Sequence, residues 1–186
     1  MNLKAIVRTY VMQFRPNSQA ELEWFKQKPT LVSAIQFATL AINSRGKRYS
    51  HQRRLKKAVL EEAKHILLSN RGVLAKCKTF EKLFVTINTL LEPVYGIGEL
   101  YVYDTALRIG AHLDLLPTKV YLHAGTGIGA HAIGFTSAVG TIEVSALPKE
   151  LQLLEPYEIE DVLCLFKKNV TEMSAEDMSP NRSWCG

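Results

Sequence analysis

Two glycines one residue apart, Gly96 and Gly98, stand between two stretches of apolar residues at helical spacing. Leu91 and Val94 precede them at the spacing of a packed hairpin, and a long apolar-periodic stretch follows. Glycine lets the backbone turn tightly and approach a ligand without a clash at Cβ. The first amides of the second helix, and the positive end of its dipole, would face that ligand. The segment predicts a helix-hairpin-helix whose turn, Gly96-Ile97-Gly98, holds a nucleic-acid phosphate; the alternative is a plain connection between two core helices.

A run of positive charge precedes this segment. Residues 45–57 hold seven Lys or Arg and no acid. Such a run can neutralise several phosphates, and Tyr49 within it could stack on an exposed base. The alternative is a solvated face. The side chains that we expect to contact nucleic acid are Arg45, Lys47, Arg48, Arg53 and Arg54.

Two side chains are candidates for catalysis. Asp104 lies six residues after Gly98 and is the carboxylate that could organise a site beside the turn. His123, like His131, flanks a glycine run and could act in acid–base chemistry or touch a phosphate. The alternatives are a locally hydrogen-bonded Asp and structurally engaged histidines.

The glycine run itself, with Gly125, Gly127 and Gly129, could bind an anion through its backbone amides. Close helix packing is an equal alternative. A dinucleotide site is disfavoured because no βαβ pattern surrounds the run, and the Gly-Lys-Ser/Thr ending of a P-loop does not follow it.

The segment from Leu91 to Gly110 resembles the helix-hairpin-helix of the DNA glycosylase superfamily that includes endonuclease III-like repair enzymes. The helical layout before it, and residues 116–123 after it, look like the same arrangement. The resemblance implies a mostly helical fold, binding of double-stranded or damaged DNA, and a place in base excision or DNA repair.

This chain departs from the family at both catalytic positions. The nucleophilic Lys of the bifunctional enzymes would stand two residues past the second glycine, where this chain has Leu100. The family's essential Asp would fall around residues 121–123, which contain no carboxylate. A glycosylase needs a carboxylate to stabilise developing positive charge and to orient a nucleophile. An enzymatic activity is therefore left open; if there is one, it is that of a DNA N-glycosylase-like hydrolase.

Charge is unevenly distributed along the chain, whose formal net charge is +5. Residues 1–142 hold 19 Lys/Arg against 9 Asp/Glu, and residues 143–186 hold 4 against 9. A basic body with an acidic end suggests a polyanionic partner. Four acids within residues 155–161 are expected on the solvent face of the last helix, or as a phosphate mimic against the basic run.

The three cysteines, Cys77, Cys164 and Cys185, are far apart and odd in number. No Cys-x-x-Cys or His-rich spacing occurs, so we expect no metal site, no iron–sulfur cluster and no other cofactor. A reduced, cytoplasmic location fits this pattern best. We expect no membrane span and no signal-peptide core. The oligomeric state is left open.

The fold expected from these patterns is mostly α. We predict a single-domain helical bundle over residues 1–168, with a helix-hairpin-helix at its centre and one small β-hairpin, followed by a flexible tail over 169–186. A capping box at residues 18–21 starts a short helix, and Gly72 is expected to stop a later one. The predicted helices cover 22–26, 31–42, 55–68, 80–91, 98–113, 128–135 and a stretch after Pro156; the predicted strands lie within 119–123 and 141–145.

These patterns lead to one function and one alternative. The first is a DNA-binding protein with a glycosylase-like helical fold. The second is a protein-interaction or small-ligand module on the same scaffold, with its pocket in the glycine-rich segment 120–134.

Overall fold

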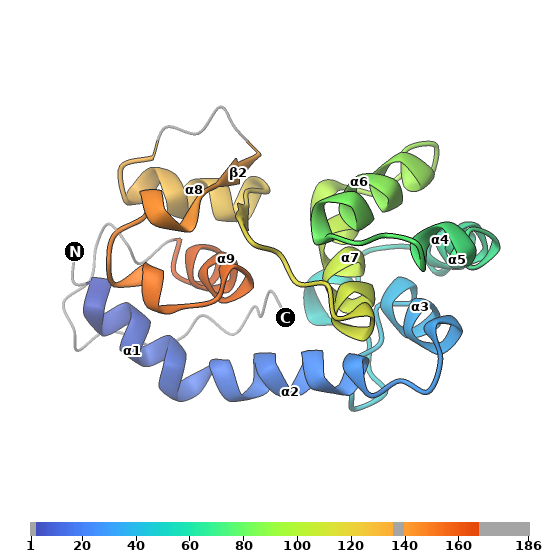
Figure 1. Ribbon diagram of the computed structural model, residues 1–186, viewed down its shortest axis with the longest axis horizontal. Helices are drawn as coiled ribbons and strands as arrows, with labels where there is room; N and C mark the ends of the chain where they lie inside the picture. Colours follow the sequence, from blue (N-terminus) through green and yellow to red (C-terminus); the bar gives the residue numbers. More distant parts are fainter. Residues whose placement is uncertain (1–2, 136–139, 168–186) are drawn as a thin grey trace. The chain divides into compact units, whose positions relative to one another are not determined.

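The computed structural model describes residues 3–135 and 140–167 of the chain, which are mostly helical, with one small two-stranded antiparallel sheet (Figure 1). The predicted fold class is confirmed. The chain forms two compact units: unit 1 comprises residues 1–18 and 118–186, and unit 2 comprises residues 19–117. The boundary between residues 18 and 19 lies inside helix α2 (Arg15–Lys26). The sequence there therefore shows no Gly-, Pro- or Ser-rich linker that would indicate the boundary. The predicted flexible tail lies outside the described residues.

Unit 2 is built around α7 (Glu99–Leu113), which packs against α3 (Leu31–Thr39) and α6 (Phe80–Leu91). Ten of the fifteen residues of α7 are buried, which makes it the central helix of the unit. The short helix η1 (Ser50–Gln52) and the helices α4 (Lys57–Ser69) and α5 (Arg71–Leu74) complete the unit. The helices expected over 31–42, 55–68, 80–91 and 98–113 are thus confirmed with small shifts at their ends.

Unit 1 is built around α9 (Pro156–Leu165), which packs against α8 (Ala124–Ala132), α1 (Leu3–Gln13) and strand β1 (Val120–Tyr121). Strand β2 (Thr141–Ile142) pairs antiparallel with β1, with Val120 opposite Ile142. Two short helices, η2 (Val144–Ala146) and η3 (Leu151–Leu153), lead into α9. Apolar residues from both ends of the chain form one core in this unit.

Three local predictions are wrong. Ser18 does not start a helix, because α2 already begins at Arg15; its hydroxyl instead donates to Asp161 at 2.9 Å. Gly72 does not stop α4, which ends at Ser69, and lies inside α5. The helix expected over 128–135 starts earlier, because α8 covers Ala124–Ala132 and includes the glycine run.

The acids of α9 also differ from the prediction of a solvent face. Glu158 is fully buried and bonds Arg15 through both carboxylate oxygens, each at 2.8 Å. Glu160 is buried as well, and Asp161 accepts a hydrogen bond from Tyr10 at 2.8 Å. Buried carboxylates need such partners, since an unpaired buried charge is costly. These acids stabilise unit 1 from within.

Within the described ranges, no helix is both long enough and apolar enough to cross a membrane.

Candidate nucleic-acid interface

The connection between α6 and α7 is a tight, exposed turn. The amide of Ile97 donates to the carbonyl of Val94 at 3.3 Å, which closes a four-residue β-turn. Gly96 occupies its third position with φ of +94°, the left-handed value that a type II turn requires there and that favours glycine. Leu91 and Val94 are buried and fix the turn to the unit. The predicted hairpin is therefore present, with Gly96 and Gly98 on its surface.

The start of α7, like that of α4, has no side-chain cap, whereas α3 and α6 are capped. Thr30 and Thr79 cap α3 and α6 by accepting a hydrogen bond from a first-turn amide. At α7 the capping position is Gly98, which has no side chain and makes no such bond. The first-turn amides of a helix have no acceptor within the helix itself. At α7 they are therefore left for a ligand from outside or for water, as the phosphate prediction requires.

A side chain at Gly98 would fit the protein itself. Its φ is −112°, which any residue adopts, and a Cβ placed there would meet no atom within 4 Å. Gly98 is therefore dispensable for packing within the chain. A bound phosphate that approaches the backbone would provide the close contact that the protein alone lacks.

The first half of the basic run is a short ordered loop. Ile42 and Arg48 form an isolated β-bridge, and the side-chain oxygen of Asn43 accepts from the amides of Arg45 and Lys47, both at 3.0 Å. Gly46 has φ of +70° at the bend. This internal bonding leaves the Arg45 and Lys47 side chains exposed to solvent.

The second half of the run is fixed to α7 through Asp104. One oxygen of Asp104, Oδ2, accepts from Gln52 at 2.6 Å, lies 2.7 Å from Nε2 of His51 and accepts from Arg108 at 3.3 Å. Asp104 is buried, with 6% of its surface exposed. Arg53 and Arg54 follow directly after these anchors and are exposed. Asp104 thus orients the basic run against the same helix that begins at the turn.

Tyr49 does not present its ring for stacking. It is buried, its hydroxyl donates to Glu21 at 2.7 Å, and the guanidinium of Arg108 lies 3.9 Å from its ring centre. Burial is the main cause that raises the pKa of Tyr49 above its usual range, followed by opposing effects of nearby charges. Arg48 is half-buried, and its guanidinium donates to the carbonyl of Leu55 at 3.0 Å. This guanidinium is therefore only partly available for the predicted phosphate contact.

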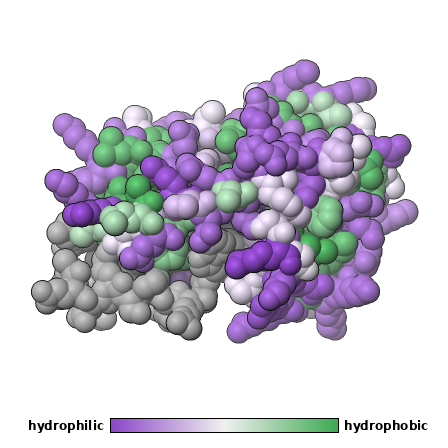
Figure 2. All heavy atoms as spheres, turned by 90° about the horizontal axis from the view of Figure 1, so that it is seen from below, coloured by the Kyte–Doolittle hydropathy of each residue, from purple (hydrophilic) through white to green (hydrophobic). Residues whose placement is uncertain are grey.

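Most of the positive charge of the chain lies in unit 2. Its residues hold 15 Lys/Arg against 9 Asp/Glu, a net of +6, whereas unit 1 holds 8 against 9, a net of −1. On the face that Figure 2 shows, many residues of unit 2 are hydrophilic. The turn, the basic run and Asp104 all belong to this unit.

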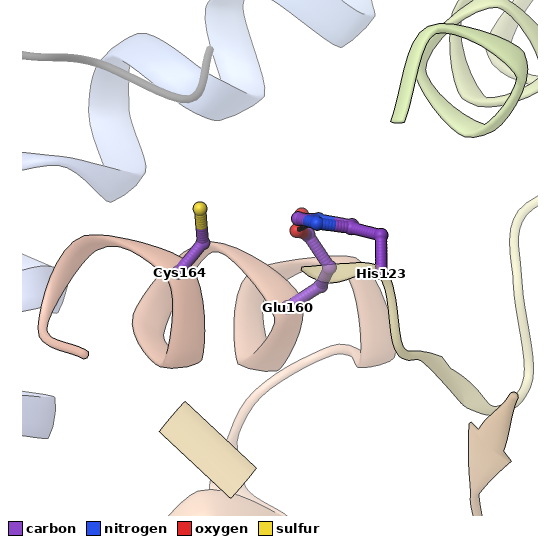
Figure 3. A group of neighbouring side chains, drawn as sticks. All are labelled: His123, Glu160 and Cys164. Atoms are coloured by element: carbon purple, nitrogen blue, oxygen red, sulfur yellow. Dashed lines mark hydrogen bonds and ion pairs between the residues drawn. The ribbon is translucent and has the colours of Figure 1, made fainter. Parts of the chain in front are cut away.

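The second candidate for catalysis, His123, lies in unit 1 in a buried cluster (Figure 3). Its Nδ1 accepts from the amide of Gly125 at 3.3 Å, which makes it the cap of α8. Its Nε2 contacts the carboxylate of Glu160 and lies 2.7 Å from the hydroxyl of Thr126, which itself donates to Glu160 at 2.9 Å. Both ring nitrogens are thus engaged within the unit.

Cys164 lies beside this pair, one helical turn after Glu160, and the three ligand atoms are within 4.8 Å of one another. His, Glu and a thiolate are ligands that zinc accepts. Cys164 is disulfide-bonded, however, so it offers no thiolate, and the other two groups bond each other. Sequence spacing missed the cluster because His123 is 37 residues from Glu160; only the i, i+4 spacing of Glu160 and Cys164 places two of its members on one helix face.

The disulfide differs from the reduced cysteines that the sequence predicted, whereas Cys77 is free and buried.

The glycine run brings α8 close to α9. A Cβ on Gly129 would lie 2.1 Å from the carbonyl oxygen of Leu163, so only glycine fits there. The amides of Gly125 and Gly127 donate to Nδ1 and the carbonyl of His123. An anion at these glycines would have to displace His123. The packing alternative therefore explains Gly129 directly, and anion binding at the run stays a prediction.

Comparison with models of protein families, with curated proteins and with solved structures finds no match. The resemblance to the DNA glycosylase superfamily therefore stays a prediction that rests on residues 91–110.

Proposed function

We propose that unit 2 binds DNA, with the Gly96-Ile97-Gly98 turn on one backbone phosphate and the exposed basic run on its neighbours. The observation that carries this proposal is the start of α7. A glycine without a side-chain cap stands there on an exposed turn, in the more basic unit of the protein. Contacts of this kind position nucleic acid without reading its bases. We therefore expect binding with little dependence on base sequence.

The proposal covers binding and leaves base excision aside. Asp104 and His123, the two candidate catalytic side chains, belong to different compact units. Each is held by bonds within its own unit, Asp104 by three side chains and His123 through both ring nitrogens. Asp104 acts in this account as a positioning residue for the basic run.

A cytoplasmic location is part of the same proposal. The disulfide at Cys164 argues against it, because disulfides persist mainly in oxidising compartments. Mass spectrometry after alkylation in cell extracts decides between the two: a reduced Cys164 supports the cytoplasm, and an oxidised one contradicts it.

Gly98→Ala tests the turn. The added methyl meets no protein atom but projects from the backbone that would face the phosphate. A hydrogen bond to a charged group contributes about 1.5–3 kcal/mol, so we expect duplex affinity to fall at least about ten-fold. Gly72→Ala in α5 is the matched control, since its Cβ also meets nothing and it lies outside the turn. Equal affinity of both variants would remove the turn from the interface.

Charge reversal tests the basic run. Arg53→Glu with Arg54→Glu should weaken binding to every duplex tested, regardless of sequence. Lys76→Glu with Lys78→Glu changes the charge of unit 2 by the same amount at two exposed positions outside the run. If both double variants lose the same affinity, only the net charge matters and the run is not a specific contact.

A further inference from the structure

Tyr95 occupies the second position of the exposed turn, directly before Gly96. The β-turn from Val94 to Ile97 places it at the first corner position, next to the buried Val94. Its side chain is 97% exposed.

This exposure sets Tyr95 apart from every other tyrosine of the chain. The sequence has seven tyrosines, and the remaining six are all at most 8% exposed: Tyr10, Tyr49, Tyr101, Tyr103, Tyr121 and Tyr157. A tyrosine buries a large apolar ring when it serves the fold. Among the described residues, Tyr95 contacts no other ring and its hydroxyl makes no hydrogen bond. Its ring therefore contributes nothing visible to the stability of unit 2.

The turn nevertheless fixes the backbone that carries the ring. Leu91 and Val94 are buried, and the bond from Ile97 to Val94 closes the turn that contains Tyr95. The backbone at Gly96 is fixed in the left-handed region. An aromatic side chain with only two rotatable torsions on such a turn loses little conformational freedom when it binds.

We propose that Tyr95 stacks on an unpaired base, so that the ligand of this surface is a nucleic acid with a gap, a bubble or a single-stranded segment. The inference rests on the proposed function, because the backbone beside that base would be held by the adjacent turn and the basic run. Aromatic rings on a basic surface bind bases in this way with little sequence preference, since every base has a π-face. The net charge of +6 on unit 2 favours a nucleic acid over an apolar partner for the exposed ring.

If Tyr95 stacks on a base, the protein distinguishes an intact duplex from a gapped one, which phosphate contacts alone do not. An intact duplex stacks its bases on one another and offers no free face to Tyr95. A duplex of the same length with a four-nucleotide gap offers both the phosphates and unpaired bases. We therefore expect the wild-type protein to bind the gapped duplex more tightly than the intact one.

The experiment measures the affinity of the full chain for these two fluorescently labelled duplexes by anisotropy, for the wild type, Tyr95→Phe and Tyr95→Ala. Tyr95→Phe keeps the ring and should retain the preference for the gap. Tyr95→Ala should bind the gapped duplex at least about ten-fold more weakly, with a change below about two-fold on the intact duplex. Because the ring is exposed, both variants should keep the wild-type thermal midpoint, which checks folding.

The outcomes separate this inference from the function on which it rests. If the wild type binds neither duplex, the proposed function is wrong. If the wild type binds both duplexes and Tyr95→Ala does so with unchanged affinities, or loses affinity equally on both, the stacking role is wrong and the phosphate interface stands. If Tyr95→Phe loses as much as Tyr95→Ala, the hydroxyl and not the ring face makes the contact, which also overturns stacking.

Discussion

At the scale of single residues, Asp104 is the side chain that joins α7 to the basic run. Its distance from Gly98 in the sequence predicts a carboxylate near the turn. The structure instead shows a buried acceptor for His51, Gln52 and Arg108. The last of these is an i, i+4 pair that the sequence contains. His51 and Gln52 belong to the short helix η1, more than 50 residues earlier, so the pattern within α7 could not indicate them.

Asp104→Asn should strongly destabilise the protein. The amide keeps the shape but removes the charge that offsets the buried guanidinium of Arg108, and breaking a buried pair in this way costs about 3–5 kcal/mol. Asp114→Asn at the end of the same helix is the control, because its pair with Lys26 is exposed and Asn tolerates its left-handed backbone. Urea unfolding of both variants measures the difference; equal midpoints would contradict a structural role for Asp104.

Tyr10 predicts how stability changes at alkaline pH. Its burial, and then the nearby Asp161, raise the pKa of its phenol above the usual value of 10.0. Below pH 10 the phenol is protonated in both states and stability does not depend on it. Above pH 10 the unfolded chain releases this proton and the native protein does not, so the free energy of unfolding falls by about 1.4 kcal/mol per pH unit.

Tyr10→Phe removes that contribution. In urea unfolding between pH 9 and 11, the variant should lose stability less steeply than the wild type, although it is less stable at pH 8 because it lacks the bond to Asp161. Tyr49 and Tyr101 also have raised pKa values through burial and leave a residual slope in both proteins. An unchanged slope in Tyr10→Phe would show that the phenol ionises in the native state.

At the scale of elements, apolar periodicity predicts most of the fold. The helices α3, α4, α6, α7 and α9 fall where their apolar residues recur at helical spacing, and the strand pair lies within the two predicted segments. Apolar periodicity does not predict the structure of the glycine-rich segment. The sequence does not indicate the start of α8, because its glycines disfavour a helix intrinsically, whereas close packing on α9 and the cap from His123 favour one. Such tertiary contacts leave no local signal.

Gly129→Ala tests that packing. The new Cβ would lie 2.1 Å from the carbonyl oxygen of Leu163, so α8 and α9 must move apart. We expect a loss of about 1–3 kcal/mol in the free energy of unfolding. Gly127→Ala in the same helix meets no atom within 4 Å and should leave stability unchanged or raise it. If both variants unfold at the wild-type denaturant midpoint, Gly129 does not limit the approach of the two helices.

Glu99→Gln tests the charge at the start of α7. Its exposed carboxylate complements the helix dipole in the free protein but repels a phosphate bound at the same place. We expect the variant to bind duplex DNA about two- to five-fold more tightly at low salt. Glu62→Gln removes an equal exposed charge from α4 and should have a smaller effect. A weaker-binding Glu99→Gln would place the phosphate elsewhere.

At the scale of the whole molecule, the distribution of charge along the sequence differs from its distribution between the two compact units. Counted along the chain, the basic part extends to residue 142. Counted by compact units, the excess positive charge of +6 belongs to unit 2, which also contains the turn. The acids of α9 bond to Arg15, Tyr10 and His123 inside unit 1. Glu158, Glu160 and Asp161 are therefore engaged within unit 1.

The salt dependence of duplex-DNA affinity tests the central claim most directly. With about six phosphate contacts, a plot of the logarithm of the association constant against the logarithm of salt concentration should have a slope of about −5. For the double variant Arg53→Glu with Arg54→Glu, the slope should be shallower, at about −3. That result would support a phosphate interface formed by the turn and the basic run. Absence of binding at about 50 mM salt, or an affinity that salt does not change, would contradict it.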